Sequence, residues 1–185
     1  MAIRFVIIPW LFVLLPTFYS FTYHRVLRPN LPVGEYKLKY KAAHACNETA
    51  NYLIDHKLYL YRVSQNRTEL RGNITLKIPF DDTLFFDINM AVLSKIGGWK
   101  DNAYVYRTGK ACSTLNFFMG PTWDEYMGLY VMHGFDLSEV YRWRFPKEFF
   151  YGTYKFRLAY TDSKDVVVGC LYVIVDVLRP WEDSY

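Results

Sequence analysis

The chain has 185 residues, of which 52% are hydrophobic, 19% aromatic and 22% charged. This length fits one domain, and this much apolar side chain excludes an intrinsically disordered protein. Lys and Arg number 22 against 18 for Asp and Glu, a formal charge of +4, and the two signs are interspersed. That distribution excludes the basic patch of a nucleic-acid-binding protein.

The first residues have the pattern of a secretory signal. Arg4 provides a short basic head, and an apolar run follows over residues 5–21, with small residues near its end. A signal anchor is the alternative, but the run contains two prolines and is short for a membrane span. We therefore expect residues 1–22 to be a signal peptide and residues 23–185 to form one secreted, extracellular domain.

Alternating apolar and polar residues predict four strands in the first half of the mature chain. The predicted strands are 36–41, 58–61, 74–80 and 84–92. Pro79 indicates that the third of them ends there or lies at a sheet edge. Turns are predicted at 64–68 and 97–98.

The second half of the chain predicts three more strands and a helical insertion. Residues 104–106 form a short strand, and 154–160 with 166–177 form a closing hairpin. Between them, residues 114–130 show helical spacing that Gly120-Pro121 divides into two short helices. We predict an all-β, immunoglobulin-like two-sheet sandwich with a short helical flap inserted before the last hairpin.

Three N-glycosylation sequons support the secreted assignment. They begin at Asn47, Asn66 and Asn73, and none has proline in its middle position. Their clustering indicates that at least one carries a glycan. An oxidising compartment also favours one disulfide among the three cysteines and leaves one thiol over. The cysteines are Cys46, Cys112 and Cys170.

Motifs for catalysis are absent from the sequence. It contains no Gly-x-Ser-x-Gly elbow, no His-Glu-x-x-His and no glycine-rich phosphate loop. A dyad of Cys112 and His133 is conceivable, but an unpaired cysteine in a secreted protein is more often a remnant or an intermolecular bridge. The acidic pairs 81–82 and 124–125 are interpreted as turn and helix-start residues rather than ion ligands. We expect no enzymatic activity, no cofactor and no metal.

Large apolar side chains are the main candidates for function. With 14 Phe, 17 Tyr and 5 Trp, the chain either packs a core or lines a ligand cavity, and periodicity does not separate the two. We expect the inner strand faces, with residues 115–135 as a gating segment, to hold a lipid or another long apolar ligand, since each buried methylene contributes about 0.8 kcal/mol. The predicted lipid-binding residues are Phe86, Ile88, Met90, Leu115, Phe118, Met119, Trp123, Tyr126, Met127, Phe135, Phe156 and Leu158.

Four short motifs carry a family resemblance. Residues 152–156 read Gly-x-Tyr-x-Phe and 168–173 read Val-Gly-Cys-Leu-x-Val, while upstream stand Gly-Asn-Ile-Thr-Leu at 72–76 and Ala-Cys-Ser at 111–113. Together they resemble the MD-2-related lipid-recognition (ML) domain family, in particular its ganglioside-activator-like branch and allied secreted insect proteins. The resemblance covers nearly the whole mature chain.

The resemblance implies a β-cup that holds acyl chains between two sheets and has no enzymatic activity. It also implies a disulfide between Cys46 and Cys170, the family's first-to-last bridge. A second family bridge would join Cys112 to a cysteine near Tyr141, where this sequence has none. We therefore expect Cys112 to lack an intrachain partner and to be buried or used between chains.

Three functions follow as expectations. The first is a secreted, non-enzymatic lipid-binding or carrier protein. The second is an extracellular accessory subunit that docks a receptor or enzyme through the flap, as a receptor co-subunit, a chemosensory protein or a glycolipid-hydrolase activator. The third, an enzyme, has no motif in its favour. We expect an apolar ligand, with a receptor or enzyme as further partner in the second case, and neither nucleic acid nor a stable membrane span.

Overall fold

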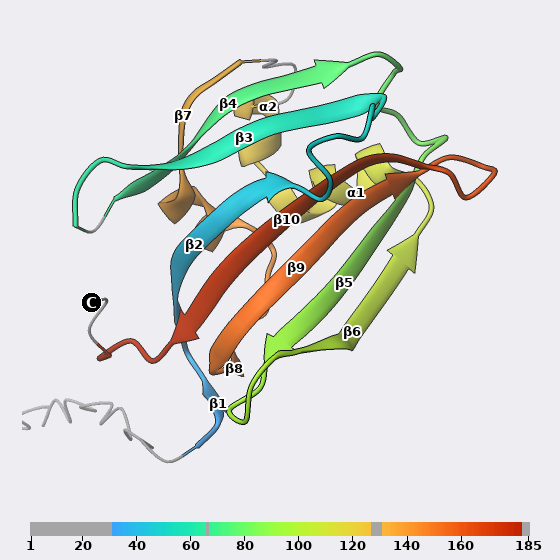
Figure 1. Cartoon of the computed structure of the whole chain (residues 1–185). Helices are drawn as coiled ribbons and strands as arrows, with labels where there is room; N and C mark the ends of the chain where they lie inside the picture. Colours follow the sequence, from blue (N-terminus) through green and yellow to red (C-terminus); the bar gives the residue numbers. More distant parts are fainter. Residues whose placement is uncertain (1–30, 66, 127–130, 183–185) are drawn as a thin grey trace, which may run out of the picture. The chain divides into compact units, whose positions relative to one another are not determined.

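The computed structural model describes residues 31–65, 67–126 and 131–182 (Figure 1). The predicted signal peptide, residues 1–22, lies outside this part of the chain. Within the described residues, no helix is both long enough and apolar enough to cross a membrane.

Strands dominate the described residues, and the helices are short and close together in sequence. The strands predicted from alternation are present, except that the one expected at 74–80 is displaced: β4 covers Thr68–Leu76, and residues 77–80 are not in a strand. The two helices divided at Gly120-Pro121 are present as well. The elements are β1 (Val33–Gly34), β2 (Lys37–Ala45), β3 (Ile54–Arg62), β4 (Thr68–Leu76), β5 (Phe85–Leu93), β6 (Trp99–Thr108), α1 (Ala111–Met119), α2 (Thr122–Tyr126), β7 (Val131–Asp136), the 3₁₀ helix η1 (Leu137–Arg142), β8 (Phe149–Phe150), β9 (Gly152–Thr161) and β10 (Val167–Leu178).

The strands form two layers of a sandwich. One layer has five antiparallel strands in the order β6-β5-β9-β10-β2, and the other has three in the order β3-β4-β7. A single parallel bridge between Gly169 and Ile54 joins the layers at one end. Figure 1 shows β3 and β4 set apart from the row of β10, β9, β5 and β6. The predicted all-β sandwich with a small helical insertion is confirmed.

Strand β7, helix η1 and the two-residue strands β1 and β8, which pair with each other in a separate small sheet, were not predicted from the sequence. The segment expected to be a helical flap therefore ends in a strand, and Phe135 lies on β7. Alternation is broken on β7 because residues 133 and 134 lie opposite Arg71 alone, which makes a bulge in its pairing with β4. Gly72 has φ +126°, and a Cβ there would lie 2.0 Å from the carbonyl oxygen of Lys57, so only glycine fits.

An acidic residue from another loop holds the start of α1. The carboxylate of Asp82 accepts hydrogen bonds from the backbone N–H of Ser113, at 2.8 Å, and from its hydroxyl. These bonds lower the pKa of Asp82. Neighbouring Asp81 accepts a bond from the backbone N–H of Thr83 in a turn. The interpretation of this acidic pair as turn and helix-start residues is confirmed.

Candidate functional site

Three strands of the five-stranded layer present one continuous apolar surface toward the other layer. On β5 and β9, Ile88 pairs with Leu158 and Met90 with Phe156, so these four side chains share a face. On β10, Leu171 and the alternate residues after it continue the same face. The predicted grouping of the even-numbered residues of β5 with those of β9 is confirmed.

The core between the layers is divided into three clusters rather than one. The first cluster lies at the end where Ile54 bridges the two layers. The second and third share partly buried Leu38 and Tyr40 of β2. A domain of this size usually has one contiguous core. The buried members are Ile54, Leu84, Phe86, Ala111, Tyr160 and Val168 in the first cluster, Met90, Tyr154, Val175 and Val177 in the second, and Phe135, Leu137 and Val140 in the third.

Burial falls toward the middle of the inner face. Phe86 is 2% exposed in the first cluster, whereas Ile88 and Leu158 are only half-buried. Leu171 and Val173 on β10 are also half-buried and belong to none of the three clusters formed by the described residues. The least completely packed apolar side chains of the inner face therefore lie at its centre, on β5, β9 and β10.

The predicted lipid-binding residues are spread over all three clusters. The structure therefore brings some of them together and separates others. The first cluster contains Phe86, with Ile88, Leu115 and Leu158 packed against it; the second contains Met90, with Phe156 against it; and the third contains Phe135.

The helical insertion contributes the remaining predicted residues. Trp123 on α2 is buried, and Phe118 and Met119 at the end of α1 are half-buried. The side chain of Tyr126 and all of Met127 lie outside the described residues, so their predicted roles stay predictions.

An aromatic ladder connects the surface to the third cluster. Ring centroids lie 5.7 Å apart for Phe117 and Phe118, 5.9 Å for Phe118 and Phe145, 5.6 Å for Phe145 and Trp143, and 6.1 Å for Trp143 and Phe135. Phe117 at one end is 56% exposed, and Phe135 at the other is buried. These spacings match favourable aromatic pairs. The ladder joins α1 to β7.

Two residues of this ladder, Trp143 and Phe145, were not predicted as site residues from the sequence. Trp143 and Phe145 follow η1, where no periodic pattern covers enough residues to assign a strand or helix. Arg144 between them holds the segment against α1, because its backbone N–H donates to the carbonyl of Phe118 at 2.8 Å and its guanidinium lies 4.8 Å from the Phe117 ring centroid. The available signal in the sequence was the alternation of two aromatic residues, Trp143 and Phe145, with an arginine between them.

Four buried side-chain atoms have no hydrogen-bond partner among the described residues: His56 Nδ1, Thr122 Oγ1, Trp143 Nε1 and Arg179 Nε. His56, on the inner side of β3, is 7% exposed, and its Nδ1 has no hydrogen bond among the described residues. Burial lowers the pKa of His56 to about 4, with Asp55 opposing weakly, so the imidazole is neutral near pH 7. Thr122 at the start of α2 is fully buried, and its hydroxyl is likewise without a partner within the described chain. Such groups are costly unless a water or ligand satisfies them.

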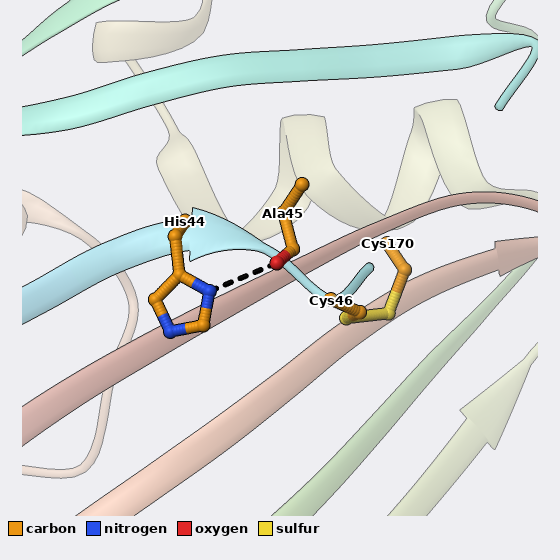
Figure 2. Close-up of a disulfide and its surroundings, with 4 residues drawn as sticks. All are labelled: His44, Ala45, Cys46 and Cys170. Atoms are coloured by element: carbon orange, nitrogen blue, oxygen red, sulfur yellow. Dashed lines mark hydrogen bonds between the residues drawn. A yellow bond between two sulfur atoms is a disulfide. The ribbon is translucent and has the colours of Figure 1, made fainter. Parts of the chain in front are cut away.

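The disulfide implied by the family resemblance is present. Cys46 and Cys170 are joined by a disulfide (Figure 2), with their Cα atoms 5.4 Å apart. The backbone N–H of Cys46 donates to the carbonyl of Cys170. The bridge ties the end of β2 to β10 next to the first cluster. Figure 2 also shows His44 with its Nδ1 on the carbonyl of Ala45.

The remaining cysteine is unlike a catalytic nucleophile. Cys112 is free and half-buried on α1, as expected, and burial together with Asp82 and Asp81 raises its thiol pKa. A nucleophilic cysteine needs the opposite shift. Among the described residues, no group of three or more His, Cys, Asp or Glu is placed to hold a metal ion.

Two sequons lie in the described part of the chain. Asn47 is exposed, and its side-chain oxygen accepts bonds from the N–H and hydroxyl of Thr49 at 3.0 and 2.8 Å. Asn73 is exposed on β4. Asn66 lies outside the described residues. Both described asparagines are accessible for glycosylation.

No protein-family model matches the chain, and a search of curated proteins finds no match. The resemblance to the ML domain family therefore stays a prediction that rests on the short motifs.

Proposed function

We propose that this chain is a secreted, non-enzymatic carrier of a lipid or another long apolar ligand, held against the inner face of the five-stranded layer. The observation that carries the proposal is the divided core: side chains at the centre of the inner face are less buried than those at its end. Two sheets normally collapse onto each other and bury such side chains. Leu158, Leu171 and Val173 would instead contact the ligand.

The arrangement also supports a route and a polar contact for the ligand. The aromatic ladder provides a continuous apolar path from exposed Phe117 to buried Phe135. His56 has an unpartnered Nδ1 that can bond one polar group of an otherwise apolar molecule. The Cys46–Cys170 disulfide is consistent with an extracellular location, because structural disulfides persist in oxidising compartments.

A pair of enlarged side chains on one strand tests this proposal. Val173 and Val175 are two residues apart on β10 and face the same side, but Val175 is 4% exposed in the second cluster, whereas Val173 is half-buried. If the proposal holds, Phe at position 173 would occupy the space of the ligand, and Phe at position 175 would overpack a cluster at a cost of roughly 1–3 kcal/mol. We expect Val173→Phe to lower uptake of a fluorescent fatty acid while its free energy of unfolding stays near that of the wild type.

Val175→Phe is the matched control, and it should lower stability with little effect on uptake measured below its melting temperature. Mass spectrometry of lipids extracted from the natively secreted wild type should identify a copurifying apolar molecule. A wild-type protein that takes up no apolar probe and copurifies with no lipid would overturn the carrier proposal. If Val173→Phe destabilises as much as Val175→Phe, the centre is packed core and the ligand site is wrong.

The exposed end of the ladder favours an accessory subunit as the second candidate function. Phe117 and Phe145 expose 56% and 38% of their surface, and exposed Arg144 lies over the Phe117 ring. Exposed aromatic side chains next to arginine are typical of protein interfaces. In this case Arg144→Gln would weaken binding to a protein partner and leave fatty-acid uptake unchanged, which separates the two functions.

A further inference from the structure

The outer face of the five-stranded layer holds a polar depression of about 320 Å³, distinct from the apolar inner face. Its lining comes from β6, β5, β9 and β10, and Ala91 provides a small side chain among larger ones. This volume is at the lower end of the range for small-molecule sites, enough for a molecule the size of one sugar unit.

Side chains from four strands stand side by side in this depression. Asn89 of β5 pairs with Arg157 of β9, which pairs with Tyr172 of β10, so the three lie in one row across the sheet. Asn102 of β6 extends the row, because Asn89 Nδ2 donates to its Oδ1 at 2.6 Å and its backbone N–H donates to Asn89 Oδ1 at 3.3 Å. The two asparagines of the row are therefore held in place before any ligand binds.

Positive charge in the row is not neutralised. Arg157 is half-buried, and within the described ranges no carboxylate pairs with its guanidinium, whereas Arg107 on the same layer pairs with Asp87. Lys155 lies with its Nζ 4.9 Å from the ring centroid of Trp99 and 4.0 Å from Asp101 Oδ1. The Asp101 side chain is 69% exposed, so water screens it strongly. Two cations and one screened carboxylate face the depression.

We propose that this depression binds a small polar molecule through an oxyanion (phosphate, sulfate or carboxylate) seated on Arg157 and Lys155. A guanidinium binds such groups through two parallel hydrogen bonds, and a partly buried one does so with little competition from water. Tyr172 and the two asparagines lie where they can contact the rest of the molecule. The oxyanion is either a free anion or the acidic group of a sugar-sized compound.

Calorimetric titration of the secreted, disulfide-bonded chain tests this site, in a phosphate-free buffer at pH 7.5 and low ionic strength. The probes are glucose 6-phosphate, inorganic phosphate and glucose. We expect saturable binding of at least one phosphorylated probe and weaker binding of glucose. Arg157→Gln should weaken that binding about tenfold or more, because it removes charge-assisted hydrogen bonds. Arg62→Gln, an exposed arginine on β3, is the matched control and should leave the affinity unchanged.

Asp101→Asn should change the affinity in the opposite direction from Arg157→Gln. Its side chain is 69% exposed, so the substitution should not destabilise the fold. Removing this carboxylate should strengthen binding about two- to fivefold. Tighter binding of glucose 6-phosphate than of inorganic phosphate would assign the oxyanion to a sugar-sized compound, and equal binding would assign it to a free anion. Absence of saturable binding by both phosphorylated probes overturns the proposal, as does glucose binding that equals glucose 6-phosphate or binding that Asp101→Asn leaves unchanged.

Discussion

The disulfide end of the sandwich and the centre of its inner face are built from the same kinds of residue, yet they differ in packing. At the disulfide end, Ile54, Phe86 and Tyr160 are buried in one cluster between the layers. At the centre, Leu171 and Val173 have the same apolar character but remain half-buried. The difference shows that an apolar strand face becomes core only where the opposite layer contacts it. One end would then supply stability and the centre would accommodate a ligand.

Removing the disulfide should give the largest loss of stability. The bridge closes a sequence separation of 124 residues, and the chain-entropy model gives about 4–5 kcal/mol for a loop of this length. Chemical denaturation of the double variant Cys46→Ser, Cys170→Ser measures it. A loss below about 1 kcal/mol would show that the disulfide end does not depend on its covalent bridge.

Truncating two phenylalanines on one sheet face compares the stability contributed at the disulfide end with that contributed at the centre. Phe86 is 2% exposed, whereas Phe156 on the neighbouring strand is half-buried. Phe86→Ala should cost about 3–5 kcal/mol, as for a buried phenylalanine, and Phe156→Ala roughly half as much. Free energies of unfolding from urea titrations check both values. Equal losses would contradict the difference in packing between the two regions.

The buried histidine should make the disulfide end sensitive to acid. His56 contacts Tyr160 of the first cluster, with ring centroids 5.9 Å apart. Its pKa falls from 6.5 to about 4 on folding because burial disfavours the charged ring. Below pH 6.5 the unfolded chain therefore binds more protons than the folded one. The stability associated with the neutral His56 imidazole is fully present above pH 6.5. It decreases as the pH falls to about 4, by about 3 kcal/mol in total.

Urea denaturation at pH 5 and pH 7.5 measures the part of this loss that occurs above pH 5, about 2 kcal/mol, and His56→Gln should remove most of the difference between the two values. His44→Gln, at an exposed position on β2, is the matched control and should keep the wild-type dependence. A wild type equally stable at both pH values would contradict the burial of a neutral imidazole.

Strand β7 shows most clearly why part of the site was beyond sequence reasoning. Its residues 133 and 134 form a bulge opposite Arg71 of β4, so the period-two pattern that identified the other strands is interrupted there. Phe135 was predicted as a site residue but assigned to the wrong element. Trp143 was missed altogether, because its neighbours in space come from other segments.

The sequence by itself determined the long strands other than β7, their apolar faces, the two short helices and the turns, because local alternation and glycine or proline placement depend on neighbouring residues. The pairing of Cys46 with Cys170 was predicted only through the family resemblance. Tertiary structure alone decided which members of an apolar face are buried, as Phe86 and Val173 show, because burial depends on how closely the other layer approaches. It also decided that Asn89, Arg157 and Tyr172 form one row, since their alignment depends on the register between strands distant in sequence.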